Sequence, residues 1–146
     1  MNPLRPILLA DDNPNDVELI LAAFHDVNFA NEITVVHDGE QALDYLFRRG
    51  AHALRAGPQP AVILLDLKMP KIDGREVLRQ IRADAALRHL PVCILTSSRE
   101  ESDLLASYQL GANAYVVKPV DFQEFTAAVS KIGCFWALLN EPPPTV

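Results

Sequence analysis

Short apolar segments alternate with helix-like patterns along the whole chain. Five such segments stand out: Ile7–Ala10, Ile33–His37, Val62–Leu65, Val92–Leu95 and Ala114–Val117. The first, third and fourth are continuously apolar, which is typical of strands that are buried on both faces of a parallel sheet. We therefore predict five strands at these positions.

Each predicted strand is followed by residues that favour the start of a helix. Asn13 can cap a helix whose first position is Pro14. After the other four strands, an acidic or hydroxyl side chain is followed three residues later by an acidic or amide side chain, which is the spacing of a capping box. These pairs are Asp38 and Gln41, Asp73 and Glu76, Ser98 and Glu101, and Asp121 and Glu124.

Apolar stripes with helical spacing follow these starts, and an amphipathic helix turns such a stripe toward the core. The first stripe contains Val17, Ile20, Leu21 and Phe24, the fourth contains Leu104, Leu105 and Tyr108, and Gly50 is expected to end the second helix. Five strand–helix units joined by right-handed crossovers predict a doubly wound α/β fold, with a five-stranded parallel sheet and five helices. Ala51–Pro60 is predicted to be an irregular surface connection.

Composition narrows the class of protein. The chain has 146 residues, of which 49% are hydrophobic and 22% charged, so we predict one globular domain over residues 1–146. The net charge of -6 argues against a nucleic-acid-binding surface. No apolar segment is long enough to span a membrane, the first residues do not resemble a signal peptide, and Cys93 and Cys134 form no CxxC pair. We expect a cytoplasmic protein that binds neither nucleic acid nor membrane.

Polar side chains follow four of the predicted strands, at the edge of the sheet where ligands bind in open α/β folds. They are Asp11, Asp12, Asp66, Thr96 and Lys118. Each residue alone is explained as a turn former, a helix cap or a solvated surface side chain. Five such residues at one edge of the sheet need another explanation. Two carboxylates about 4 Å apart repel each other by roughly 4 kcal/mol at an effective dielectric constant of 20. Converging carboxylates therefore indicate a cation, and hard oxygen ligands favour Mg²⁺.

A metal, an ammonium group and a hydroxyl donor are what a transferring phosphoryl group requires, with one carboxylate as the nucleophile. Lys118 supplies the ammonium and Thr96 the hydroxyl. Competing chemistries lack their motifs: the chain has no GxxxxGK[ST] loop, no GxGxxG after the first strand and no GxSxG elbow, and its four histidines show no metal-ligand spacing.

Four segments resemble the receiver domain of bacterial two-component response regulators. They are ILLADDNPNDVELI, LLDLKMPKIDG, LTSS and GANAYVVKPV, which occur in the family's order and spacing between Ile7 and Ile132. The resemblance implies a flavodoxin-like sheet with strand order 2-1-3-4-5. It also implies that Asp66 accepts a phosphoryl group from a phosphohistidine on a sensor histidine kinase. Such a protein has no separate substrate, so we expect that it is not an enzyme.

The resemblance further implies a role for each polar residue. Mg²⁺ would be held by Asp12 directly, by Asp11 largely through water, by Asp66 and by the backbone carbonyl of Lys68. Around the phosphoryl group, Lys118 would pair with its oxygens, Thr96 would donate a hydrogen bond to it, Tyr115 would swing inward as the switch residue, and the Lys118–Pro119 peptide would be cis.

The carboxyl end of the chain departs from a minimal receiver. We predict a core over about residues 5–133, followed at 134–146 by an extension and a Pro-rich tail. Phe135, Trp136, Leu138 and Leu139 are large apolar residues near the chain end. Either the last helix extends and docks on its own domain, or these residues form a homodimer with the fourth helix, fifth strand and fifth helix. The IGCFW stretch also resembles response regulators paired with bacterial phytochromes.

Two other functions remain as alternatives. A haloacid-dehalogenase-like phosphatase also uses an Asp nucleophile with Mg²⁺ and Lys, but its chemistry needs an acid two residues after the nucleophile, where this chain has Lys68. A binding module of the same fold would need no phosphorylation, and the intact set of Asp12, Asp66 and Lys118 argues against it.

Overall fold

The computed structural model describes residues 4–26, 29–118, 122–136 and 140–144. The strands are β1 (Ile7–Ala10), β2 (Ile33–Val36), β3 (Val62–Leu65), β4 (Val92–Thr96) and β5 (Ala114–Val117). The helices are α1 (Pro14–Asp26), α2 (Gly39–Phe47), α3 (Gly74–Ala83), α4 (Glu101–Gln109) and α5 (Phe122–Cys134), and a short 3₁₀ helix, η1, spans Gly50–His52. All five predicted strands are present, and each boundary lies within one residue of its prediction.

The five strands form one parallel sheet in the order β2-β1-β3-β4-β5. This confirms the predicted α/β fold and strand order. Ala10 is in register with Val36 and Leu65, and Thr96 is in register with Val117. The carboxyl ends of β1, β2 and β3 are therefore level, whereas β4 and β5 end together two residues further along. The residues that follow the strands lie along one edge of the sheet.

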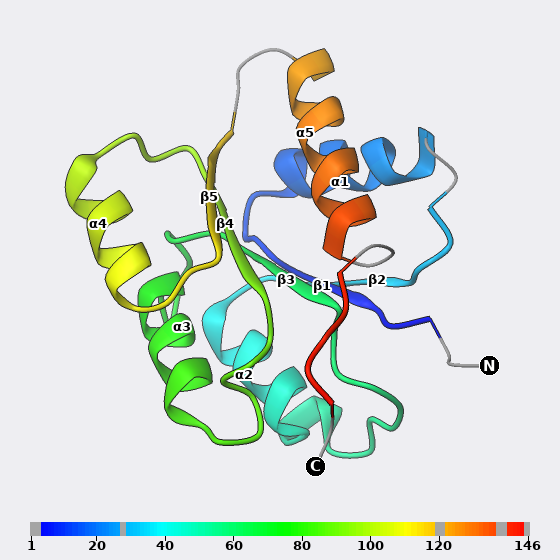
Figure 1. Cartoon of the computed structure of the whole chain (residues 1–146), viewed down its shortest axis with the longest axis vertical. Helices are drawn as coiled ribbons and strands as arrows, with labels where there is room; N and C mark the ends of the chain where they lie inside the picture. The colour runs from blue at the N-terminus through cyan, green and yellow to red at the C-terminus, as the bar shows by residue number, and fades with distance from the viewer. Residues whose placement is uncertain (1–3, 27–28, 119–121, 137–139, 145–146) are drawn as a thin grey trace.

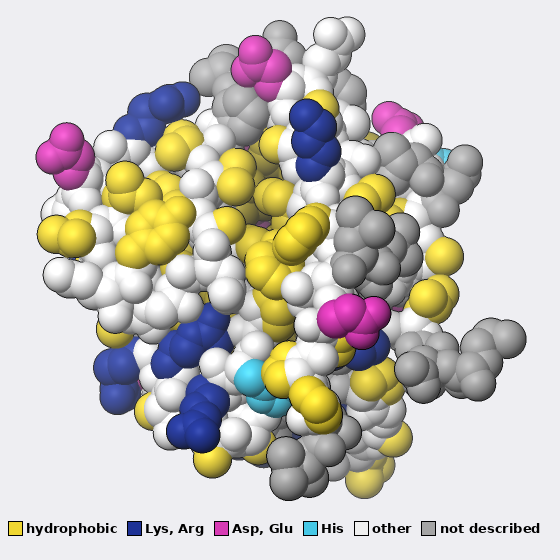
Figure 2. Space-filling view, viewed as in Figure 1, with side chains coloured by type: hydrophobic (Ala, Val, Ile, Leu, Met, Phe, Trp, Pro, Cys, Tyr) yellow, Lys and Arg dark blue, Asp and Glu magenta, His cyan; other side chains and the backbone are white. Residues whose placement is uncertain are grey.

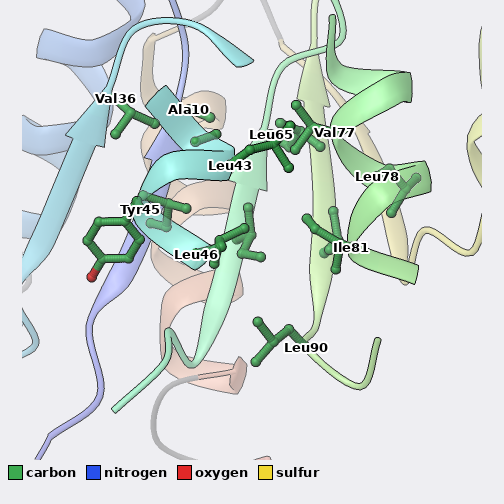
Figure 3. Close-up of a cluster of buried hydrophobic side chains, with 14 of the residues drawn as sticks. Ala10, Val36, Leu43, Tyr45, Leu46, Leu65, Val77, Leu78, Ile81 and Leu90 are labelled. Atoms are coloured by element: carbon green, nitrogen blue, oxygen red, sulfur yellow. The ribbon is translucent and has the colours of Figure 1, made fainter. Parts of the chain in front are cut away.

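Helices cover both faces of the sheet (Figure 1): α1 and α5 lie on one face, and α2, α3 and α4 on the other. Successive residues of the central strands alternate between the two layers. Leu8 and Ala10 pack with the α2 and α3 side chains shown in Figure 3. Ile7 and Leu9 pack against α1 and α5. Burial on both faces explains why these strands are continuously apolar.

Three of the predicted helix starts are confirmed. The side chain of Asn13 accepts hydrogen bonds from the first turn of α1, that of Asp38 accepts one from Gln41 N, and that of Asp73 accepts one from Glu76 N. The prediction that Ser98 caps α4 is wrong. The N-cap of α4 is Glu100, which makes no side-chain cap bond, and the Ser98 hydroxyl instead donates to a carboxylate inside the helix. The predicted cap of α5, at Asp121, lies outside the described residues.

The apolar stripe predicted for α4 does not face the core. Leu104, Leu105 and Tyr108 are 40%, 60% and 50% exposed, whereas the buried residues of this helix are Asp103 and Ser107. Figure 2 shows hydrophobic side chains gathered over α4 and on the surface between α4 and α5. The helix is turned this way because Asp103 finds polar partners inside the fold, which periodicity does not reveal. Leu21 of α1 is likewise exposed, and Ala23 is buried instead.

The connection between α2 and β3 is more ordered than predicted. Arg55 stacks on the ring of Tyr45 at 3.9 Å and donates from Nε to the Tyr45 carbonyl oxygen, and the Gln59 amide donates to the carbonyl oxygen of Leu46. These bonds satisfy carbonyls at the end of α2 that have no partner within the helix. The helix ends at a left-handed Arg48 rather than at Gly50, which begins η1.

At the carboxyl end, the two aromatic residues after α5 behave differently. Trp136 packs against the core on the α1 and α5 side, in the cluster that contains Cys93. Phe135 is 49% exposed and meets the indole edge to face, with ring centroids 4.9 Å apart. The extension therefore docks partly on its own domain, while Phe135 stays at the surface. Leu138 and Leu139 lie outside the described residues.

Within the described residues, none of the helices has the length and apolar character needed to cross a membrane.

Candidate functional site

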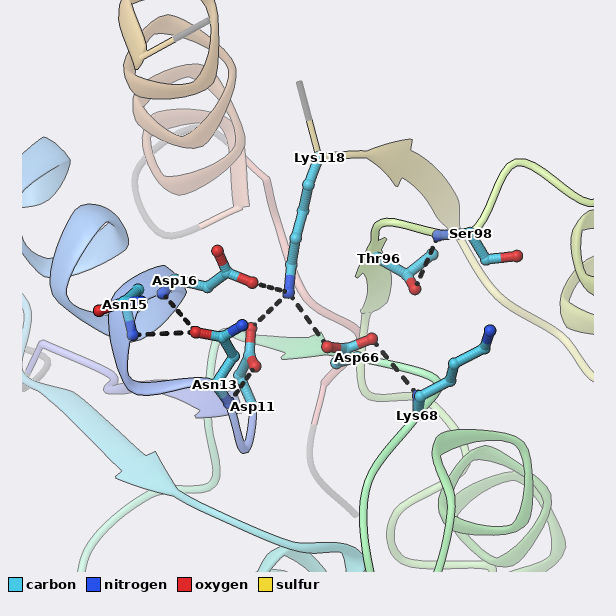
Figure 4. A network of polar contacts seen from close by, with 9 residues as sticks. All are labelled: Asp11, Asn13, Asn15, Asp16, Asp66, Lys68, Thr96, Ser98 and Lys118. Carbon is cyan, nitrogen blue, oxygen red and sulfur yellow. Dashed lines mark hydrogen bonds and ion pairs between the residues drawn. The ribbon is translucent and has the colours of Figure 1, made fainter. Parts of the chain in front are cut away.

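The structure brings together polar residues from the ends of three strands (Figure 4). Asp11 follows β1, Asp66 follows β3 and Lys118 follows β5. Because β1 and β3 are neighbours in the sheet, the carboxylates after them meet at one edge. Asp11, Asp66 and Lys118 are all largely buried, while Asp12 is exposed at the rim.

Lys118 is the hub of the site. Its Nζ lies 2.7 Å from Asp11 Oδ2, 2.9 Å from Asp16 Oδ2 and 3.0 Å from Asp66 Oδ2. An ammonium group has three N–H donors, so each donor has one carboxylate partner. Burial alone lowers the pKa of Lys118, but hydrogen bonds to Asp11 and Asp16 and the charge of Asp66 raise it well above its ordinary value. Lys118 is therefore charged throughout the physiological range.

Asp16 is the site residue that sequence analysis missed. A favourable contact with the positive end of the helix dipole is enough to account for an acidic residue in the first turn of α1, so its position indicates no further role. In the structure its carboxylate forms the outer partner of Lys118, with 28% of its side chain exposed. The cap at Asn13 is the sequence feature that could have indicated this role. It fixes the direction of the first turn of α1 relative to Asp11, and Asp16 lies in that turn.

Asp11 is the most deeply buried acid of the site. Burial raises the pKa of its carboxyl group, and hydrogen bonds from Lys118 and from the backbone N–H of Asn13 oppose this but do not cancel it. The carboxylate is therefore held in a place where its charge is costly without a nearby cation. Lys118 supplies part of that compensation.

Three carboxylates are arranged as a metal site. One ligand oxygen each from Asp11, Asp12 and Asp66 lie within 4.8 Å of one another. With Asp16 the site contains four carboxylates and a single ammonium, so a net negative charge remains. Hard oxygen ligands and excess negative charge suit a divalent cation such as Mg²⁺ or Mn²⁺. The donor set therefore fits the metal that the sequence indicated.

The loop after β3 shapes the surroundings of Asp66. Lys68 donates its backbone N–H to Asp66 Oδ1 over 3.4 Å, while its side chain is exposed. A Cβ atom on Gly74 would lie 2.2 Å from the backbone oxygen of Asp66, so only glycine lets the start of α3 approach so closely. The start of α3 is thereby packed directly against the backbone of Asp66.

Thr96 and Tyr115 converge on the loop that follows β4. Thr96 is buried at the end of β4, and its Oγ1 accepts a hydrogen bond from Ser98 N over 3.3 Å. The half-buried Tyr115 donates its hydroxyl to the carbonyl oxygen of Ser98 over 3.0 Å. Both side chains are therefore tied to one residue, although they come from different strands. The Lys118–Pro119 peptide lies partly outside the described residues.

Comparison with known proteins identifies the family. The model of the response regulator receiver domain matches residues 7–130. Response regulator Rcp1 of Synechocystis is 36% identical over 135 residues, covering 92% of this chain and 90% of that protein. A solved Mn²⁺-bound form of Rcp1 is 34% identical, with a TM-score of 0.87 over 96% of this chain and 99% of that chain.

Two solved regulators have names that refer to phytochromes. The phosphorylated cyanobacterial phytochrome response regulator RcpA is 36% identical, with a TM-score of 0.89 over 97% of this chain and 100% of that chain. The bacteriophytochrome response regulator RtBRR is 57% identical, with a TM-score of 0.79 over 97% of this chain and 86% of that chain.

The fold, the acidic cluster and these matches define a signalling receiver. The chain belongs to the response regulator receiver family. It accepts a phosphoryl group on an aspartate in two-component signalling, and it is not a classical enzyme. The family match favours this reading over the phosphatase alternative. Asp11, Asp12 and Asp66 form its acidic metal site.

Proposed function

We propose that Asp66 is the phosphoacceptor of this receiver and that Mg²⁺ is its metal. One observation carries the assignment: Asp66 shares both a buried lysine and a potential metal site with Asp11. Direct ligation by Asp12 and Asp66, support from Asp11 and a backbone carbonyl ligand from Lys68 complete the proposed metal set. Magnesium, when bound, would neutralise charge on the carboxylates and on the incoming phosphoryl oxygens.

The proposed reaction is the transfer of a phosphoryl group from a phosphohistidine to the Asp66 carboxylate, which forms an acyl phosphate. A carboxylate oxygen of Asp66 attacks the phosphorus of a phosphohistidine, the new O–P bond forms, and the N–P bond to the imidazole breaks. Lys118 already lies 3.0 Å from Asp66, so its ammonium can pair with a phosphoryl oxygen as the charge moves there. Asp16 keeps Lys118 in place, because it holds one N–H donor that the phosphoryl group does not need.

The proposed switch uses Thr96 and Tyr115. A phosphoryl group adds charge and acceptor oxygens, and the Thr96 hydroxyl can donate to them if it moves toward Asp66. Since Thr96 and Tyr115 are both bonded to Ser98, a shift of the first changes the packing available to the second. The outcome is a surface with two states that a partner can distinguish.

The proposed partner is a sensor histidine kinase, and specifically a bacterial phytochrome. The 57% identity to a bacteriophytochrome response regulator supports this choice. We propose that transfer takes place in the cytoplasm, and that neither nucleic acid nor membrane is a direct partner. We also propose that residues 1–146 act as one receiver domain, with a core at about 5–133 and an extension at 134–146.

Phosphoryl uptake tests the function directly. Incubation with a small acyl phosphate and Mg²⁺ is expected to add one phosphoryl mass per chain, because the proposed acceptor lies beside Lys118 and within the acidic cluster. Intact-protein mass spectrometry measures the gain, and a chelator added beforehand should abolish it. A protein that gains no mass, or that gains it equally well with the chelator, would contradict the proposal. A transfer panel with purified histidine kinases, scored by the fastest labelling, then identifies the partner.

We further propose that the exposed apolar side chains of α4, together with β5, α5 and Phe135, form a homodimer contact. Leu104, Leu105 and Tyr108 form one exposed apolar surface, and such surfaces mark interaction sites.

Leu105→Glu should shift the protein from dimer to monomer in sedimentation velocity, with or without a phosphodonor. Leu54→Glu is the matched control, because Leu54 is 97% exposed in the connection after α2. A parent protein that stays monomeric at high concentration in both conditions would remove the proposal.

A further inference from the structure

The inner face of α4 is polar. Asp103 is 3% exposed and Ser107 is fully buried, while the leucines of the same helix face outward. A buried carboxylate is stabilised only where its charge is paired or hydrogen-bonded. The partners of Asp103 therefore determine which face of α4 lies against the domain.

Asp103 has partners from two other segments. Its Oδ2 accepts a hydrogen bond from the Ser98 hydroxyl over 2.5 Å. Its Oδ1 forms a hydrogen-bonded ion pair with the guanidinium of Arg75 on α3. Its backbone oxygen accepts the hydroxyl of Ser107 over 2.7 Å. One side chain thus joins the loop after β4 to α4 and to the first turn of α3.

Ser98 connects this arrangement to the switch residues. Its backbone N–H donates to Thr96 Oγ1, its backbone oxygen accepts from the hydroxyl of Tyr115, and its own hydroxyl is bonded to Asp103. All three polar groups of Ser98 are therefore engaged, and each has a partner on a different element. A displacement of Thr96 must move Ser98 or break one of these bonds.

We propose that Asp103 is a positioning residue that carries the movement of the loop after β4 to α4. This inference rests on the proposed phosphorylation of Asp66. It adds a mechanical connection that runs from Ser98 through Asp103 to the exposed face of α4. Rotating α4 so that its leucines face inward would carry the Asp103 carboxylate away from both Ser98 and Arg75. Because both contacts would be lost together, α4 is held in a definite orientation that the loop controls.

Amide hydrogen exchange separates this role from simple stabilisation. Exchange is measured over residues 97–109 in the parent, Asp103→Asn and Glu101→Gln proteins, each with and without the acyl phosphate and Mg²⁺. Glu101→Gln is a matched control because it removes the same charge from the same helix turn at an exposed position. Mass spectrometry of the same samples gives the phosphorylated fraction.

In the parent and in Glu101→Gln, phosphorylation should change exchange in both the loop and α4. In Asp103→Asn the loop change should persist while the change in α4 is lost, and α4 should exchange about tenfold faster before phosphorylation, as expected for losing a hydrogen bond to a charged group. A phosphorylation-dependent change in α4 that survives in Asp103→Asn would overturn the inference, because losing a residue that only stabilises α4 would raise exchange equally in both states.

Ser98→Ala provides a second route if Asp103→Asn does not fold. It removes the hydroxyl that Asp103 accepts and leaves Arg75 in place, so it should also uncouple α4 from the loop. Where Asp103→Asn folds, the loss of coupling in the double variant should be no greater than in either single variant, because both changes break the same link. Additive effects would overturn the inference. A parent chain that takes up no phosphoryl group would instead contradict the proposed function.

Discussion

Asp66→Asn is expected to take up no phosphoryl group from an acyl phosphate in the presence of Mg²⁺. The amide is a poor nucleophile and a weak metal ligand, so both the acceptor oxygen and one ligand of the proposed site are lost. Intact mass spectrometry measures the result, and peptide mapping of the phosphorylated parent should place the added mass on the peptide that contains Asp66.

Asp73→Asn is the matched control for this substitution. Asp73 lies at the end of the loop that begins at Asp66, and its side chain caps α3 by accepting a hydrogen bond from Glu76 N. Asparagine caps a helix equally well. This variant should therefore take up phosphoryl groups like the parent. Uptake by Asp66→Asn at the parent rate would assign the acceptor to another residue, and loss of uptake in both variants would indicate a general defect of the loop.

Lys118→Met is expected to give the largest loss of stability in the metal-free protein. Lys118 is 7% exposed and satisfies three carboxylates, so its removal leaves Asp11 buried without a cation. Removing one partner of a buried ion pair costs about 3–5 kcal/mol of unfolding free energy. Thermal or urea unfolding in a chelator measures this loss. Adding Mg²⁺ at about 100 times its dissociation constant should restore roughly 2.7 kcal/mol, because the metal binds only the folded site.

The loss of unfolding free energy in Lys118→Met should become smaller as the pH falls. The pKa of Asp11 is raised by burial, and without Lys118 it rises further because the opposing hydrogen bond is gone. A raised pKa contributes stability that is present at low pH and is lost as the pH rises through the folded-state pKa. The gap in unfolding free energy between parent and variant should therefore narrow as the pH falls from 7 toward about 4.

Lys71→Met controls for the loss of a lysine in this region. The Lys71 side chain is 60% exposed and lies 3.8 Å from Asp38 and 3.7 Å from Glu40, and exposed pairs of this kind contribute little. Its unfolding free energy should stay within about 1 kcal/mol of the parent, with no gain from Mg²⁺ beyond that of the parent. A Lys118→Met protein as stable as Lys71→Met in chelator would show that the acidic cluster does not depend on Lys118.

The pattern of apolar and polar residues was enough to predict the fold and most of the candidate site. Continuously apolar runs such as Val62–Leu65 can be satisfied only by burial on both faces of a sheet, and the caps at Asn13, Asp38 and Asp73 set where three helices start. Polar residues directly after strands must then meet at one edge, so Asp11 and Asp66 could be paired without coordinates. These inferences hold because they depend on local periodicity and on the geometry of parallel strands.

The partners of Asp16 and the orientation of α4 could not be predicted from local patterns, because both depend on contacts between distant segments. Asp16 meets Lys118 across 102 positions of sequence, and Asp103 meets Arg75 across 28. Apolar spacing placed Leu104 and Leu105 inside, yet the buried carboxylate of Asp103 determines the inner face. The physical reason is that an ionised group in the interior must be paired, and its partners come from segments whose proximity exists only after the chain has folded.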